Sequence, residues 1–133
     1  MIRVYTLLPA MALTATMAVA QEDSTAAPAA PEFDAEMAYE SARNQLGVLK
    51  YCQESGHIDG TAVEIQERLL TMLPTGDAVK GDAAEEKGKA GTVSAMGAEQ
   101  TLEAAAAAQS TTEDALCKQM DTMIQQLAAQ LPA

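Results

Sequence analysis

The chain is 133 residues long and strongly acidic, with 8 basic and 19 acidic side chains and a net charge of −11. This length allows one small domain, and the charge excludes a nucleic-acid binder, because such a surface repels phosphate. Aromatic residues make up 3% of the chain, there is no Trp, and there are two Cys. The sequence alone therefore indicates an architecture and a crosslink more directly than an activity.

The first twenty residues have the pattern of a secretory signal peptide. Arg3 gives a short positive start, an uncharged apolar run follows, and an A-V-A motif of small residues ends at Ala20. We expect cleavage before Gln21, which places the protein in the periplasm or outside the cell. A membrane anchor fits less well, because the apolar run is short and contains Pro9, whereas a spanning helix needs about 20 apolar residues.

The rest of the chain is predicted to form a flexible leader and one helical domain. Residues 21–32 are polar and rich in Ala and Pro, with nothing to bury. Residues 33–133 contain few Leu, Ile, Val and Phe, but their Ala and Met are helix formers that recur at helical spacing. We therefore expect an all-α fold, a small up-down helical bundle of three or four helices.

Two helices are predicted in the first half of this domain. The first begins at Phe33 or Asp34 and ends at Gly56, which suits a left-handed cap. The second is short, because residues 61–64 fit a capping box and Pro74 stops the helix. Their apolar faces follow a spacing of three or four residues: Ala38, Ala42, Leu46, Leu49 and Cys52 in the first, and Ala62, Ile65, Leu69 and Met72 or Leu73 in the second.

The third predicted segment, residues 82–109, contains a seam of small side chains. At alternating spacings of three and four residues, the seam includes Gly88, Gly91, Ala95, Ala98 and Leu102. Each interior Gly costs about 1 kcal/mol of helix propensity, so the glycines imply either tight packing of one continuous helix or a break near Gly88 to Gly91. We interpret the seam as a surface for helix packing or for helix association within a membrane.

The last predicted helix follows a second capping box at residues 110–113. Two cysteines in an oxidising compartment most simply form one disulfide, so we expect a bond between Cys52 and Cys117. It would close a loop of about 66 residues, worth about 4 kcal/mol in the chain-entropy model. The bond would also join neighbouring ends of two antiparallel helices. The apolar face of the last helix is expected to contain Cys117, Met120, Ile124, Leu127 and Leu131.

No pattern in the sequence predicts a catalytic site, a cofactor or a metal site. His57 is the single histidine, has no second nitrogen or thiolate ligand at zinc spacing, and is interpreted as a turn residue. A nucleophile–base pair of Cys52 and His57 would need a thiolate, which a disulfide removes. The acidic clusters at residues 82–86 and 113–114 lack EF-hand spacing and are interpreted as solvated faces. We expect a protein partner, a membrane or a second copy of the chain, and no small-molecule substrate.

Residues 41–64 (SARNQLGVLKYCQESGHIDGTAVE), residues 85–97 (EEKGKAGTVSAMG) and the later C-K-Q at 117–119 carry a family resemblance. They resemble a small exported family of alphaproteobacteria labelled pore-forming, ESAT-like, and the resemblance covers most of the mature chain. It implies a secreted helical protein related to early secretory antigenic targets, with membrane permeabilisation as its activity.

Two functions are expected from these observations. The leading one is an exported acidic helical protein that acts by interaction, with membrane permeabilisation implied by the resemblance. The alternative is a periplasmic stress chaperone similar to the acid-activated HdeA-type proteins. In that case, protonation of carboxylates at low pH would expose methionine-rich faces.

Overall fold

The computed structural model describes residues 34–95 and 97–132. Within these residues, five helices and two strands follow one another as α1 (Ala35–Glu54), α2 (Thr61–Met72), α3 (Ala78–Lys89), β1 (Thr92–Ala95), β2 (Ala98–Thr101), α4 (Leu102–Ala108) and α5 (Glu113–Ala128). The structure confirms a mostly helical fold with one disulfide. The strand pair and the fifth helix were not expected, and the predicted signal peptide (1–20) and leader (21–32) lie outside the described residues.

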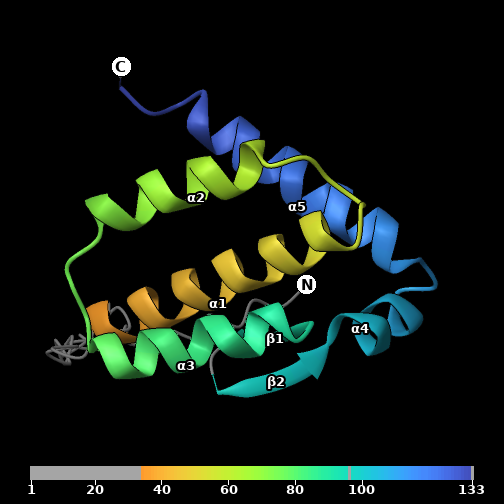
Figure 1. The fold of residues 1–133 in the computed structure, drawn as a ribbon, viewed down its shortest axis with the longest axis horizontal. Coiled ribbons are helices and arrows are strands. Elements are labelled where there is room, and N and C mark those ends of the chain that lie inside the picture. Colours follow the sequence, from red (N-terminus) through yellow and green to blue (C-terminus); the bar gives the residue numbers. More distant parts are fainter. Residues whose placement is uncertain (1–33, 96, 133) are drawn as a thin grey trace, which may run out of the picture. The chain divides into compact units, whose positions relative to one another are not determined.

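Helix α1 is the central element of the fold (Figure 1). It contacts α2, α3, α5 and β1. In Figure 1, α1 and α3 run in one direction, whereas α2 and α5 run in the other. Two clusters of buried side chains lie against α1: one joins Val48 and Cys52 to α4 and α5, and the other joins Leu46 and Leu49 to α2 and α5.

The predicted ends of α1 are close to the observed ones. The side chain of Asp34 accepts hydrogen bonds from the backbone N–H groups of Glu36 and Met37, which caps the start of the helix. Beyond its end, Gly56 has a φ of 76°, the left-handed conformation that the sequence predicted.

Both predicted capping boxes are wrong in detail. The N-cap of α2 is Gly60, and the side chain of Asp59 accepts the N–H of Thr61. The N-cap of α5 is Thr112. The expected cap, Ser110, has a φ of 53° just after α4, whereas an N-cap residue is normally extended.

The predicted apolar faces are confirmed where the helices converge and wrong where the helices diverge. Of the alternatives Met72 and Leu73 at the end of α2, Met72 is 55% exposed and Leu73 is half-buried, and Leu127 near the end of α5 is 43% exposed. The predicted residues that are buried lie closer to the disulfide or to the middle of α1: Leu46, Leu49, Cys52, Ala62, Cys117 and Ile124.

Of the two interpretations of residues 82–109, the structure confirms a break near Gly88 to Gly91 and excludes one continuous helix. Helix α3 ends at Lys89, and the chain turns through Gly91, whose φ of 81° suits glycine. Strands β1 and β2 then form an antiparallel hairpin with Thr92 opposite Thr101, and Gly97 lies in its turn with a φ of 80°. The seven residues of α4 are the helical remainder of the segment. Among the described residues, no helix combines the length and the apolar character needed to cross a bilayer.

Candidate functional site

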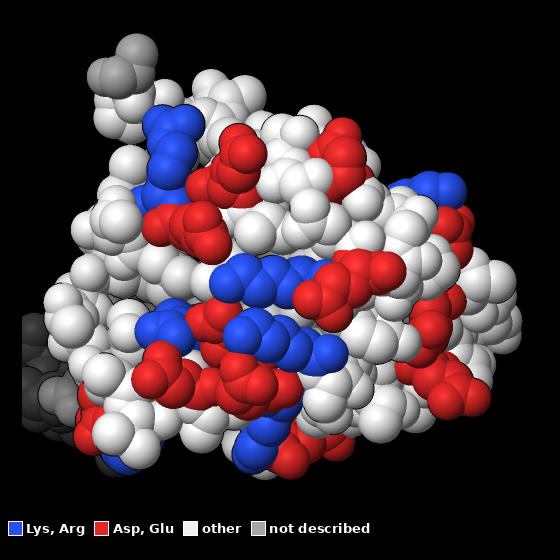
Figure 2. All heavy atoms as spheres, viewed as in Figure 1, with Lys and Arg blue, Asp and Glu red and all other residues white. Residues whose placement is uncertain are grey.

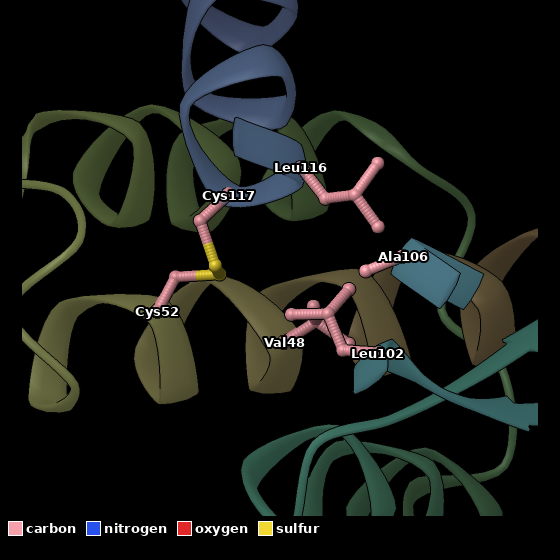
Figure 3. Close-up of a cluster of buried hydrophobic side chains, with 6 residues drawn as sticks. All are labelled: Val48, Cys52, Leu102, Ala106, Leu116 and Cys117. Carbon is pink, nitrogen blue, oxygen red and sulfur yellow. A yellow bond between two sulfur atoms is a disulfide. The ribbon is translucent and has the colours of Figure 1, made fainter. Parts of the chain in front are cut away.

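A buried disulfide joins the C-terminal end of α1 to the start of α5. The Sγ atoms of Cys52 and Cys117 are bonded, their Cα atoms are 5.6 Å apart, and neither residue is exposed. Figure 3 shows the bond at one side of a cluster of buried side chains that includes Leu102, Ala106 and Leu116. The crosslink predicted from the sequence is therefore present. It joins α1 to α5, and both helices contribute to the cluster that also contains residues of α4.

The five residues of the predicted seam lie on four elements and a turn. Gly88 is in α3, Gly91 in the turn, Ala95 on β1, Ala98 on β2 and Leu102 in α4, so they do not form one helical face. The two glycines are nevertheless packing positions. A Cβ on Gly88 would lie 2.3 Å from the carbonyl oxygen of Asn44, and a Cβ on Gly91 would lie 3.2 Å from the ring of Tyr51.

The other three seam residues line one hollow, which we call the hairpin cleft. It has a volume of about 350 Å³ and lies over one face of the hairpin, against α4 and the first turns of α5. Its apolar lining consists of Val93, Ala95, Ala98, Leu102, Ala105, Leu116 and Met120. Part of the predicted seam therefore does lie on one surface. That surface is concave, and it is formed by a hairpin and α4 and not by one helix.

The floor and the rim of the hairpin cleft differ in chemistry. Leu102 and Leu116 are 2% and 8% exposed and belong to the cluster that contains the disulfide. The rim carries the amides of Gln100, Gln109 and Gln119, and Glu99 is the one charged residue of the lining. The carboxylate of Glu99 forms an ion pair with Lys87 of α3. A strongly acidic protein thus has an almost uncharged apolar hollow.

The outer edge of β2 borders this cleft. Leu102 N–H donates to the carbonyl of Gly91, which lies opposite it in the ladder. Since paired residues of an antiparallel ladder alternate between inward and outward backbone groups, the N–H groups of Glu99 and Thr101 point away from β1. The sheet formed by the described residues has two strands, so this edge has no third strand beside it. All four residues of β2 are exposed.

Asn44 holds the hairpin against the helices, and sequence reasoning missed it. Its side chain is 2% exposed, donates to the carbonyls of Ala84 and Thr92 at 3.0 Å, and accepts the N–H of Ser94 at 2.8 Å. One amide thereby joins α1, α3 and β1. The spacing in the sequence could have indicated that Asn44 is buried. Asn44 precedes the apolar Val48 by four residues, so both lie on the same face of the helix.

A cluster of charged side chains also fixes α3 to α1. The carboxylate of Glu85 lies 2.7 Å from Arg43 and 2.8 Å from Lys50, and Arg43 also contacts Asp82 at 2.5 Å. Burial alone would raise the pKa of Glu85, but hydrogen bonds from Lys50 and Arg43 and their charges outweigh burial and lower it. Figure 2 shows that basic side chains on one face of the molecule are bordered by acidic ones.

His57 lies beside the disulfide without forming a reactive pair with it. Its backbone N–H donates to the carbonyl of Cys52, and its Nδ1 lies 3.2 Å from a carboxylate oxygen of Asp114. A hydrogen bond from Lys118 is the main reason that the pKa of Asp114 is lowered. Cys52 is bonded to Cys117 and therefore offers no thiolate. Within residues 34–95 and 97–132, no three His, Cys, Asp or Glu residues are grouped so as to hold a metal ion.

The hairpin cleft is thus the candidate site. It has an apolar floor, a rim of amides and an exposed strand edge, and three of the predicted seam residues line it. Its groups suit non-covalent binding through buried apolar area and backbone hydrogen bonds. Comparisons of the chain with family models, with curated proteins and with solved structures found no match.

Proposed function

We propose that this protein is an exported interaction module that binds an extended apolar segment of a partner protein at the hairpin cleft. The observation that carries the proposal is the position of an apolar hollow of about 350 Å³ beside the exposed edge of β2. A partner strand would pair with the backbone of Glu99 and Thr101 and place apolar side chains over Leu102 and Leu116. Main-chain hydrogen bonds would supply affinity, and the hollow would supply specificity.

The disulfide supports both export and rigidity. Disulfides persist mainly in oxidising compartments such as the periplasm and the extracellular space, which agrees with the proposed signal peptide. Because Cys117 immediately follows Leu116, the crosslink holds the floor of the cleft in place before a partner arrives. Such preorganisation lowers the entropy cost of binding.

A selection from displayed short peptides tests the proposal, with the oxidised mature protein as bait and two variants as controls. Ala98→Arg places a long charged side chain in the cleft at an exposed position, whereas Ala108→Arg places the same side chain on an exposed part of α4 that does not line the cleft. Selected peptides should be apolar and should bind Ala98→Arg at least about tenfold more weakly, a loss of roughly 1.4 kcal/mol. Peptides that bind all three proteins equally would contradict the proposal.

The contribution of the strand edge can be isolated at Thr101. This residue has a φ of −70°, which proline also adopts, so Thr101→Pro removes the outward N–H at little backbone cost. Both Thr101→Pro and Thr101→Ala lose the side-chain cap of α4, and only the first loses the N–H. Weaker peptide binding by Thr101→Pro than by Thr101→Ala supports strand pairing, and equal binding excludes it.

Membrane permeabilisation, implied by the family resemblance, stays a prediction. The predicted small-residue seam does not support it, because the five residues lie on separate elements and not on one helix. Dye release from liposomes by the oxidised protein tests this activity directly.

An acid-activated chaperone is the second candidate, and Glu85 favours it. This buried carboxylate joins Arg43 and Lys50 of α1 to α3 only while it is ionised. Its protonation at low pH would weaken the contact between the helices and expose apolar side chains. Failure to suppress aggregation of an acid-denatured client near pH 3 would rule the chaperone out, whereas peptide binding at neutral pH would be unaffected by that result.

A further inference from the structure

A second apolar hollow lies where α1, α2 and α5 diverge, and we call it the methionine groove. It has a volume of about 370 Å³ and shares no lining residue with the hairpin cleft. Ile124, which lines it, is 2% exposed. Its outer walls are exposed, with Met72 at 55%, Met123 at 53% and Leu127 at 43%. Methionine side chains are flexible and adapt to an occupant.

Gln66, in α2, is the unusual residue of this groove. It is 3% exposed, and its Nε2 donates to the carbonyl of Ala42 in α1 at 3.0 Å. Its Oε1 is buried and has no hydrogen-bond partner among residues 34–95 and 97–132. The bond to Ala42 fixes the orientation of the amide, because rotating it would place two oxygens against each other. Burying an acceptor without a hydrogen-bond partner costs free energy. An occupant of the groove that donates a hydrogen bond to Oε1 would recover that free energy, which would favour binding.

The lining restricts the chemistry of that occupant. The described residues that line the groove include no charged side chain, so a charged donor such as Lys or Arg would lose its hydration without gaining a counter-charge from them. A suitable side chain has a large apolar body and one neutral donor. Indole fits this description best, because its N–H only donates, whereas a tyrosine hydroxyl also has acceptor lone pairs to satisfy. The volume is in the range of about 300 to 1,000 Å³ that is usual for ligand pockets.

We propose that the methionine groove is a docking site for a tryptophan side chain of a partner protein, whose indole N–H donates to Oε1 of Gln66. The chain itself contains no Trp, so the ligand must come from another protein. Because Oε1 is shielded from water, the occupant must displace part of the lining, and the flexible, half-exposed Met72 and Met123 can move at low cost. This proposal does not depend on the function of the hairpin cleft.

The absence of Trp makes the test direct. The probes are N-acetyl-tryptophanamide and its analogue methylated at the indole nitrogen, each added to the oxidised mature protein. Indole fluorescence can be excited where the two tyrosines of the mature chain, Tyr39 and Tyr51, do not absorb. The parent probe should bind with a blue shift of its emission and perturb the amide resonances of Leu69, Met123 and Leu127. The methylated probe, which lacks the donor, should bind about tenfold more weakly.

Two variants identify the acceptor. Gln66→Met keeps the length of the side chain and removes Oε1, so it should bind the two probes equally. Gln45→Met makes the same change at a partly exposed residue of the same groove and should preserve the tenfold difference. Equal binding of both probes to the wild type, a preserved difference in Gln66→Met, or no binding of the parent probe at millimolar concentration would each overturn the proposal.

Discussion

Gly47 of α1 and Gly88 of α3 bring the backbones of the two helices into direct contact. A Cβ on Gly47 would lie 2.1 Å from the carbonyl oxygen of Glu85, and a Cβ on Gly88 would lie 2.3 Å from that of Asn44. This approach lets the side chain of Asn44 reach across α3 to the hairpin. The position of the hairpin cleft therefore requires glycine at both positions, because any side chain there would push α1 and α3 apart.

Replacement of Gly88 by alanine should destabilise the protein, although alanine is the better helix former. The added methyl group meets backbone atoms that cannot move without shifting α1, so we expect a loss of about 2–3 kcal/mol. Urea unfolding at neutral pH measures it. Gly60→Ala is the control, because its new Cβ meets only the flexible end of Gln53 and the change should cost no more than the loss of a glycine N-cap, about 1 kcal/mol or less. Equal effects of the two substitutions would show that the close contact is not real.

Asn44→Ala should separate the hairpin from the helices. The substitution leaves the N–H of Ser94 without its acceptor and two carbonyls without their donor, which we expect to cost about 3 kcal/mol. Hydrogen exchange at Ser94 should accelerate more than exchange in α2, which Asn44 does not contact. Uniform acceleration across the domain would instead indicate general destabilisation.

Glu85 makes stability depend on pH in a defined direction. Its pKa is lowered in the folded state from an ordinary value near 4.5, so its contribution is present above that pH and is lost as the pH falls through the lowered pKa. Glu85→Gln should therefore cost about 2–3 kcal/mol at pH 7, and the difference from wild type should shrink near pH 3.

The neighbouring Glu86→Gln provides the control for this pH series, since Glu86 is exposed and its one ion pair among the described residues is with Lys89. It should change stability by less than about 0.5 kcal/mol at every pH. A wild-type advantage over Glu85→Gln that stays constant from pH 7 to pH 3 would contradict the assigned role of Glu85.

Removal of the disulfide by the double change Cys52→Ala and Cys117→Ala should cost about 4 kcal/mol according to the chain-entropy model. For a domain of this size that is a large share of the usual 5–15 kcal/mol. Urea unfolding of oxidised, reduced and doubly substituted protein measures the effect. The model fails if all three proteins unfold at the same urea concentration.

The sequence predicted the first helix, its two ends and the disulfide that joins it to the last helix. The start of α1 near Asp34, the left-handed Gly56 and the pairing of Cys52 with Cys117 depend on local chemistry or on simple counting, and the structure confirms them. The boundaries of α2 and α5 were less well predicted, because several Ser, Thr and Asp residues near each start could act as the cap.

A break near Gly88 to Gly91 was one of the two predicted outcomes for the third segment, but the hairpin that follows it could not be predicted, because the hairpin is decided by tertiary contacts. The spacing that suggested one helical seam also places Ala95 opposite Ala98 in a hairpin, and no local signal tells these outcomes apart. The hairpin is held by Asn44, fifty residues before Ser94 in the sequence. Gln66 was likewise missed, because a polar residue inside an apolar face becomes visible only when its partners are known.

Amide hydrogen exchange at β2, with and without a selected peptide, tests the central claim most directly. If an extended partner segment pairs with the edge strand at the hairpin cleft, the amides of Glu99 and Thr101 become protected on binding, while those of α2 remain unchanged. If these two amides exchange as fast in the complex as in the free protein, the partner binds elsewhere and the proposed function is wrong.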